Sequence, residues 1–270
     1  MPRLQTDKLQ IRYNEKVVIN DLQIEIPDKK ITTIIGANGC GKSTLLKAMT
    51  RIIPHQKGTI MFDGKEIAKE NTKQLARKMA ILPQTQESAS GLTVGELVSY
   101  GRFPYQSGFG RLTKHDYEVI DWALEVTNSM DYKYLPVDSL SGGQRQRVWI
   151  AMALAQETKV IFLDEPTTYL DMAHQLEILE LLQRLNEEEE RTIVMVLHDI
   201  NQAARFADHI IALKNGEIMK QGTNHEVIHP DVLREVFHIE AVIGKDPITN
   251  QPICITYHLI KGEKEHEKYD

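Results

Sequence analysis

The sequence is poor in cysteine. Among its 270 residues, only Cys40 and Cys254 carry a thiol. Two cysteines cannot form the framework of several disulfides on which small secreted domains depend. That class of protein is therefore excluded, and a reducing cytosol is the compartment that this composition favours.

Long hydrophobic runs and an excess of basic charge are also missing. No apolar run approaches the ~18 residues that a membrane-spanning helix requires. The first residues, MPRLQTDKLQIRY, lack the apolar region of a signal peptide. The formal net charge is -6, which argues against a polyanion-binding protein, although it leaves room for a local basic patch.

The residues that are present alternate between strand and helix patterns. Apolar runs predict strands at 4–13, 17–26 and 31–36, and a helix begins at Ser43. The pattern is helical over residues 92–155, as in an insertion, and alternates again afterwards. The runs VIFL and IVMVL are apolar throughout, which is typical of strands covered on both faces. This order predicts an α/β core with a helical subdomain.

A phosphate-binding loop lies between the third strand and the first helix. The segment GANGCGKS fits the pattern GxxxxGK[ST]. In this pattern, glycines let backbone N–H groups surround phosphates, the lysine reaches the β- and γ-phosphates, and the serine hydroxyl ligates Mg²⁺. We interpret the cysteine as a small filler rather than a redox group. The predicted binding residues are Gly36, Ala37, Asn38, Gly39, Cys40, Gly41, Lys42, Ser43 and Thr44.

Two acidic residues follow a later apolar strand. The run VIFL delivers Asp164 and Glu165 to a sheet edge, where ligands gather in open α/β sheets. Asp164 is expected to hold Mg²⁺ directly or through water. Glu165 is expected to polarise the attacking water. With the phosphate loop, this pair indicates a nucleoside triphosphatase.

The segment LSGGQRQR places Gly142 and Gly143 at the start of a strongly helical run. Glycine costs a helix about 1 kcal/mol relative to alanine, so the pair requires a reason. A helix start with free N–H groups can bind an anion. Because the phosphate loop already offers such a site, the segment raises the question of which phosphate it serves.

A resemblance answers that question. Together with Gln84, the Asp171 loop and His198, these motifs resemble the ATP-binding cassette (ABC) family in its motif order, roughly from Leu4 to Gly222. The resemblance implies a phosphate-loop NTPase core with a mixed sheet, an antiparallel β subdomain and a helical insertion. It implies a nucleotide-binding domain at 1–255, with the helical subdomain at about 88–155, and a flexible polar tail at 256–270.

The same resemblance implies the roles of the site residues. Cassettes of this family work as head-to-tail dimers, so the LSGGQ helix start binds the γ-phosphate of the ATP that the partner's phosphate loop holds. Tyr13 stacks on adenine, Gln84 approaches Mg²⁺ and water, and His198 contacts the γ-phosphate. The expected catalytic residues are Glu165, His198 and Gln84; the metal ligands are Ser43, Gln84 and Asp164; and the signature residues are Ser141, Gly142, Gly143 and Gln144.

Further segments resemble one branch of the family. The segment TTYLD after Pro166, the segment at 98–116 and KDPITNQPIC look like importers of iron–siderophore complexes, haem and cobalamin. The resemblance implies an ATP-hydrolysing subunit of a bacterial importer, at the cytoplasmic face of the membrane. Its partners would be a second copy of itself, two permease subunits and, indirectly, a substrate-binding protein, with no nucleic acid. We expect an iron–siderophore cargo, with haem or cobalamin as alternatives.

Two other classes of function compete with import. A cassette ATPase acting on nucleic acid or ribosomes usually carries two cassettes or a long coiled-coil insertion, and the sequence has neither. A degenerate cassette would act only as a scaffold. That reading is disfavoured because Lys42, Asp164, Glu165 and His198 are all in place.

Overall fold

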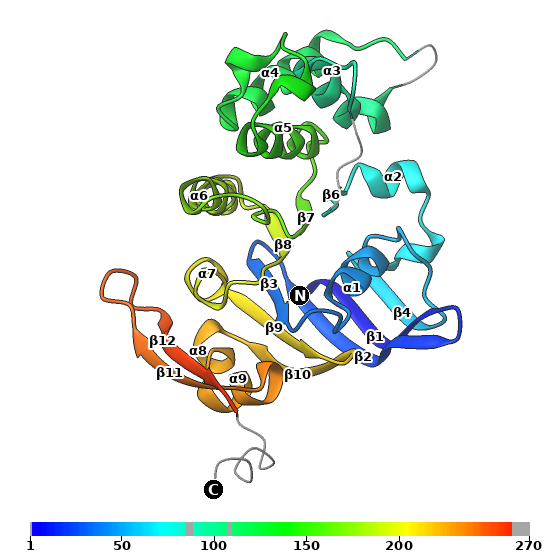
Figure 1. Ribbon diagram of the computed structural model, residues 1–270. Helices are drawn as coiled ribbons and strands as arrows, with labels where there is room; N and C mark the ends of the chain where they lie inside the picture. Colours follow the sequence, from blue (N-terminus) through cyan, green and yellow to red (C-terminus); the bar gives the residue numbers. More distant parts are fainter. Residues whose placement is uncertain (1, 85–88, 107–109, 261–270) are drawn as a thin grey trace, which may run out of the picture.

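Three layers build the molecule around one long sheet (Figure 1). The computed structural model describes residues 2–84, 89–106 and 110–260. Helices of the middle of the chain stack at one end, drawn in green, and the first strands form a separate sheet drawn in blue. The predicted α/β architecture, with a mixed sheet and an antiparallel β subdomain, is confirmed.

The antiparallel sheet has the strand order β2-β1-β4-β5. Alternating apolar residues such as Leu9, Ile11, Ile24 and Ile60 are buried on its inner face, as the period-two pattern predicted. Its strands are β1 (Pro2–Tyr13), β2 (Lys16–Pro27), β4 (Lys57–Phe62) and β5 (Lys65–Glu66).

The central sheet has the order β10-β9-β3-β8-β7-β6. The strands from β9 to β6 in this order pair in parallel, and β10 pairs antiparallel with β9. Every residue of β3, β7 and β8 is buried, because helices cover one face and the antiparallel sheet with the first helix covers the other. The strands are β3 (Ile31–Gly36), β6 (Met79–Leu82), β7 (Val160–Asp164), β8 (Thr192–Val196), β9 (His209–Lys214) and β10 (Glu217–Gly222).

Helices surround the central sheet. Those that pack on it are α1 (Lys42–Met49), α2 (Thr72–Ala76), α6 (Met172–Glu189) and α7 (Ile200–Phe206). The helical insertion contains α3 (Val94–Ser99), α4 (Lys114–Val126), α5 (Gly142–Leu154) and short 3-10 turns at Tyr100–Tyr105, Met130–Tyr132 and Val137–Ser139. Another 3-10 turn, Ile67–Lys69, precedes α2. The predicted start of the insertion at residue 88 lies outside the described residues.

A buried arginine links several segments of the helical insertion through ion pairs and a hydrogen bond. Arg102 is 1% exposed. Its guanidinium forms ion pairs with Asp116 at 2.7 Å and Glu157 at 2.6 Å, and donates a hydrogen bond to the Ala155 carbonyl at 2.8 Å. It also lies 4.1 Å from the centre of the Tyr105 ring. A buried charge requires such partners, because an unpaired one is strongly destabilising.

The C-terminal part contains elements that the sequence patterns did not indicate. Helices α8 (Asn224–Val227) and α9 (Pro230–Phe237) precede a hairpin of β11 (Ile239–Lys245) and β12 (Pro252–Leu259). Asn201 fastens this hairpin to α7, since its amide bonds both the N–H and the carbonyl of Cys254. The tail expected from residue 256 therefore starts later, because 256–259 pair as a strand; residues 261–270 lie outside the described part.

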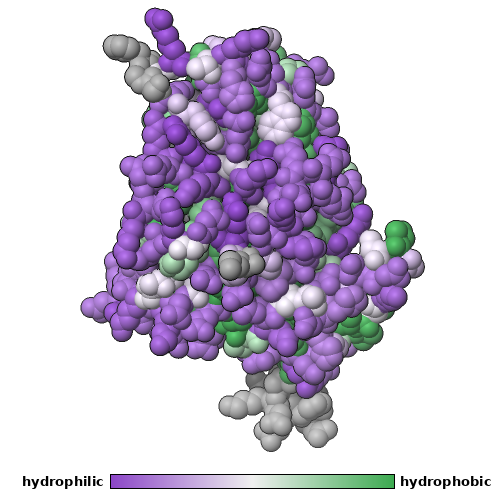
Figure 2. All heavy atoms as spheres, turned by 180° about the vertical axis from the view of Figure 1, so that it is seen from behind, coloured by the Kyte–Doolittle hydropathy of each residue, from purple (hydrophilic) through white to green (hydrophobic). Residues whose placement is uncertain are grey.

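The molecular surface is mostly polar on the face shown in Figure 2, where hydrophobic side chains occur in small separate groups. Within the described residues, no helix combines the length and the apolar character that crossing a membrane requires.

Candidate functional site

Four of the parallel strands, namely β3, β6, β7 and β8, carry the sequence motifs to one edge of the central sheet. The phosphate loop follows β3, Gln84 follows β6, Asp164 ends β7, and His198 follows β8. Because the carboxyl ends of parallel strands meet at the same edge, these side chains converge. They border a cleft of about 640 Å³. The predicted members of its lining are Tyr13, Asn38, Gly39, Gly41, Lys42, Ser43, Thr44, Gln84, Glu165 and His198.

Glycines give the phosphate loop its path. Gly41, directly before α1, has φ 108°, a left-handed conformation that favours glycine. A methyl group on Gly36 would lie 2.2 Å from the Leu213 carbonyl oxygen, so only glycine lets the loop leave β3 beside β9. Ala37, Asn38 and Gly39 are exposed to the cleft. Backbone N–H groups at the start of a helix are suited to bind phosphate.

The lysine of this loop is buried, and within the described part of the chain it forms no ion pair with a carboxylate. Lys42 is 5% exposed. Its ammonium donates hydrogen bonds to the carbonyls of Gly36 at 2.9 Å and Ala37 at 3.1 Å. Both acceptors are neutral, so the positive charge remains available to an anion in the cleft.

Asp164 and Ser43 offer oxygen ligands for a cation. The Ser43 hydroxyl donates a hydrogen bond to Asp164 Oδ1 at 2.8 Å. The other oxygen, Oδ2, is buried and has no hydrogen-bond partner among the residues that the structure describes. Burial raises the pKa of Asp164, although the bond from Ser43 opposes the rise. An unpartnered carboxylate oxygen beside a hydroxyl fits Mg²⁺, which binds through one or two carboxylates and otherwise keeps water or phosphate oxygens.

Glu165 is held by donors from three loops. Gln84 Nε2 lies 2.6 Å from Oε2, Thr168 Oγ1 lies 3.1 Å from the same oxygen, and His198 Nε2 lies 2.6 Å from Oε1. The backbone of Glu165 is left-handed, with φ 55°, a strained conformation of the kind that gathers at functional sites. The carboxylate is thereby fixed at the cleft and can accept a proton from water.

The sequence prediction missed some members of the cleft. Thr168, Tyr169, Lys16 and Val18 also line it. Thr168 could have been found, because it stands three residues after Glu165 in the same loop. Lys16 and Val18 lie on β2, next to the turn after Tyr13. Tyr13 is 46% exposed, which leaves its ring open to a flat ligand.

The signature segment lies elsewhere. Among the described residues that line the cleft, none belongs to 141–144. Ser141 caps α5 through the N–H of Gln144, and the Gln144 side chain accepts from the N–H of Ser141. A methyl group on Gly142 would meet nothing within 4 Å, so this helix start is open in the single chain. The cleft and the signature therefore lie apart from each other in the single chain.

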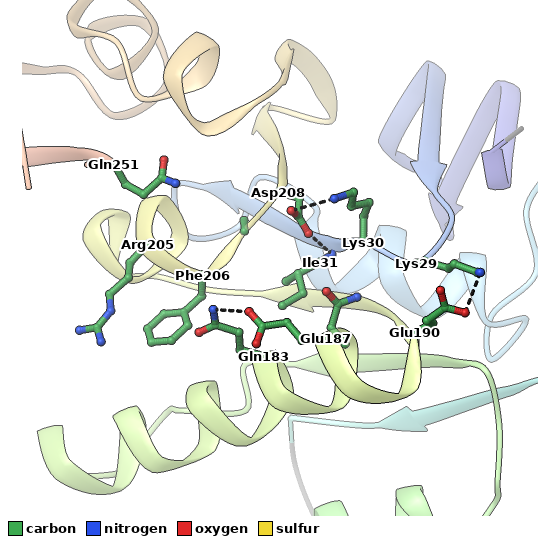
Figure 3. Close-up of a pocket in the computed structure, with 12 residues that line it drawn as sticks. Lys29, Lys30, Ile31, Gln183, Glu187, Glu190, Arg205, Phe206, Asp208 and Gln251 are labelled. Atoms are coloured by element: carbon green, nitrogen blue, oxygen red, sulfur yellow. Dashed lines mark hydrogen bonds and ion pairs between the residues drawn. The ribbon is translucent and has the colours of Figure 1, made fainter. Parts of the chain in front are cut away.

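A second cavity, of about 470 Å³, lies at the amino end of β3 (Figure 3). Its cations are already neutralised. Lys29 pairs with Glu190 at 2.7 Å, and Lys30 pairs with Asp208 at 3.2 Å. Asp208 also accepts from the Ile31 N–H at 2.9 Å. Compensated charges of this kind stabilise the sheet end and leave little attraction for a further ion.

Comparison with known proteins supports one family. A family model described as ABC transporter matches residues 19–168, a range that includes the phosphate loop, LSGGQ and Glu165. The iron(3+)-hydroxamate import ATP-binding protein FhuC of Bacillus subtilis (strain 168) is 60% identical over 265 residues, covering 98% of each chain.

Solved structures agree with that family. One described as an inward-facing metal-chelate type ABC transporter has a TM-score of 0.82 at 28% identity, covering 96% of this chain and 98% of the other. A bacterial ABC transporter cassette, solved as a dimer, has a TM-score of 0.73 at 28% identity, covering 82% of this chain and 98% of the other.

Proposed function

Because the chain belongs to the ABC transporter family, we propose that it is the ATPase subunit that powers import of iron(3+)–hydroxamate complexes. As an ABC ATPase it binds ATP and couples hydrolysis to transport. The observation that carries the cargo assignment is 60% identity to FhuC over nearly the full length of both chains. The assembled cluster of Lys42, Asp164, Glu165 and His198 supports an active enzyme rather than a scaffold.

The described geometry supports a division of labour in the cleft. The phosphate-loop N–H groups and Lys42 bind the phosphates, and Tyr13 stacks on the base. Asp164 and Ser43 would hold Mg²⁺, with Gln84 as a further oxygen ligand. When bound, the ion neutralises charge on the phosphates. Glu165 accepts the proton of the attacking water, while Thr168 and His198 fix the orientation of its carboxylate.

A second copy of the chain would complete the site. The signature residues Ser141–Gln144 lie outside the chain's own cleft, so they are free to serve a neighbour's nucleotide. Two chains arranged head to tail would place each signature over the other chain's phosphate loop. A related cassette was solved as a dimer, which supports the assembly of two copies.

The remaining partners follow from the importer assignment. The chain would lie at the cytoplasmic face of the membrane, on two permease subunits that act with a substrate-binding protein. We assign residues 1–259 to the nucleotide-binding domain, beyond the predicted bound at 255, because β12 ends at Leu259. We assign residues from about 88 to 155 to a helical unit that carries the signature.

Gene deletion with defined iron sources tests the cargo. Deletion should abolish uptake of radiolabelled iron(3+) bound to a hydroxamate siderophore, and the wild-type gene should restore it. Glu165→Gln should not restore it, since loss of a general base typically costs 10²–10⁴-fold in rate. Uptake of haem and cobalamin in the same strain is the control. Loss of either one, with hydroxamate uptake intact, would contradict the cargo assignment.

A further inference from the structure

An imidazole ring packs against the signature residues Ser141–Gln144 of the same chain. His174 lies in the first turn of α6, the helix that begins after the Glu165 loop. Asp171 caps this helix by accepting from the His174 N–H at 3.0 Å. Both carboxylate oxygens of Asp171 also lie 2.8 Å from His174 Nδ1. The backbone bond and then the ring bond lower the pKa of Asp171, so the ring is held by a charged carboxylate.

This ring packs directly on the signature. A methyl group on Gly143 would lie 2.7 Å from His174 Cδ2 and 3.0 Å from Cγ. Cβ atoms do not approach other heavy atoms that closely, so the ring accounts for glycine at this position. The neighbouring Gly142 has open space around it. The two glycines of LSGGQ therefore meet different constraints. The His174 ring of the same chain leaves no room for a side chain at Gly143, whereas no neighbour within 4 Å restricts Gly142.

Further contacts join the same two elements. Gln146 on α5 donates to the Pro166 carbonyl at 2.8 Å, one residue after Glu165. Arg147 on α5 pairs with Glu177 on α6 at 2.6 Å. The first turns of the signature helix thus rest on the segment that runs from Glu165 into α6, and the His174 ring fills the contact nearest to the signature glycines.

We propose that His174 is a positioning residue: its ring, fixed by Asp171, sets the place of the signature glycines relative to the Glu165 loop of the same chain. The inference rests on the proposed head-to-tail dimer, in which the signature serves the partner's nucleotide. Movement of the Glu165 loop in one cleft then moves the signature that completes the other. His174 acts through Gly143 and touches neither nucleotide.

The purified full-length chain tests this with matched variants. His174→Ala should keep the ATP affinity of the wild-type chain within about twofold, because its own cleft is untouched, and should keep the thermal midpoint. Its kcat for ATP hydrolysis should fall at least tenfold. An unchanged kcat would overturn the proposal, as would a fall in kcat matched by an equal loss of ATP affinity.

A rescue experiment separates packing within the chain from blockage of the nucleotide. Gly143→Ala should lower kcat at least threefold below the kcat of His174→Ala, because its methyl group clashes with the ring that His174→Ala merely removes. The double variant should return to the kcat of His174→Ala, a recovery of at least threefold relative to Gly143→Ala alone. Gly142→Ala, which has no contact to relieve, should gain nothing from His174→Ala. Equal rescue of both glycine variants, or of neither, would overturn the assignment.

The same set distinguishes this inference from the proposed function. If Gly142→Ala and Gly143→Ala both hydrolyse ATP at the wild-type rate, the signature does not complete a partner site and the dimer proposal fails. If both glycine variants lose activity while His174→Ala behaves as wild type, the dimer stands and only the role of His174 is lost.

Discussion

Two buried cations show how the same molecule uses charge in opposite ways. Arg102, in the helical insertion, pairs with two carboxylates and stacks on Tyr105. Lys42, in the phosphate loop, is nearly as buried, but its hydrogen bonds go to neutral carbonyls. The charge of Arg102 is compensated inside the fold, whereas that of Lys42 awaits an anion from outside.

This difference in partners distinguishes a charge that stabilises the fold from a charge that is available to bind a ligand. The lysines of the cavity in Figure 3 are also paired with carboxylates, although their side chains are exposed, unlike that of Arg102. Burial alone therefore does not identify a binding site. The informative feature is a buried cation whose partners carry no negative charge.

The largest effect is expected from removing the compensated charge. Arg102→Ala leaves Asp116 buried without its cation, which typically costs 3–5 kcal/mol in free energy of unfolding. Urea unfolding measures the loss. Arg102→Lys is the control, since it retains the charge and should lose less. The ATP affinity of the folded fraction should be unchanged. An Arg102→Ala chain that is as stable as the wild type but binds ATP weakly would contradict the assignment of Arg102 to fold stability.

Removing the uncompensated charge should act on binding instead. Lys42→Ala deletes a charge-assisted contact worth about 1.5–3 kcal/mol, which lowers ATP affinity roughly 10- to 150-fold. The free energy of unfolding should change by less than about 1 kcal/mol, because no carboxylate loses its partner. Calorimetric titration with ATP gives the affinity. Lys30→Ala, in the second cavity, is the matched control and should bind ATP as the wild type does.

Acid should weaken the Arg102 cluster through Asp116. Burial raises the pKa of Asp116, but hydrogen bonds from Thr113 and the Arg102 guanidinium outweigh it and hold the pKa below its ordinary value of 3.8. A lowered pKa stabilises the fold fully above pH 3.8 and ceases to do so as the pH falls through the folded-state value. Asp116→Asn should thus cost about 1.5 kcal/mol at pH 7 and little in strong acid. A pH-independent cost would contradict the ion pair.

The smallest effect concerns a thiol beside Lys42. Burial raises the pKa of Cys40, and the nearby Lys42 charge only partly opposes this. Since the thiolate is the reactive form, Cys40 should alkylate slowly in the folded chain at neutral pH and readily after unfolding. Mass mapping after iodoacetamide treatment measures this. Rapid labelling of Cys40 in the folded chain would mean that Lys42 ionises its neighbour.

The sequence predicted the residues at the carboxyl ends of the parallel strands far better than the helical insertion and the C-terminal hairpin. Gly36–Ser43, Asp164 and His198 each follow an apolar strand, and parallel strands must bring such residues together. The arginine in the GRFPYQ segment could not be placed, because charged residues lie at the surface by default and only tertiary packing buried this one. The β11–β12 hairpin was not predicted. Val242, Ile255 and Tyr257 are exposed in it, so its strands lack the alternation of buried apolar and exposed polar residues on which strand prediction relies.

The LSGGQ motif illustrates a different limit. The sequence predicted that this helix start binds a phosphate and offered one reason for both glycines. The ring of His174 beside Gly143 is a contact across 31 residues that no local pattern encodes.

The two carbonyl bonds of Lys42 have a consequence for the heat of nucleotide binding. The ammonium donates two hydrogen bonds within the loop itself, to the carbonyls of Gly36 and Ala37. Binding therefore exchanges partners more than it adds them, and the number of hydrogen bonds at this nitrogen changes little. The enthalpy released at Lys42 will be smaller than its contacts in a bound complex suggest. Much of its contribution to affinity will come from the long-range attraction between charges and from the water released as they meet.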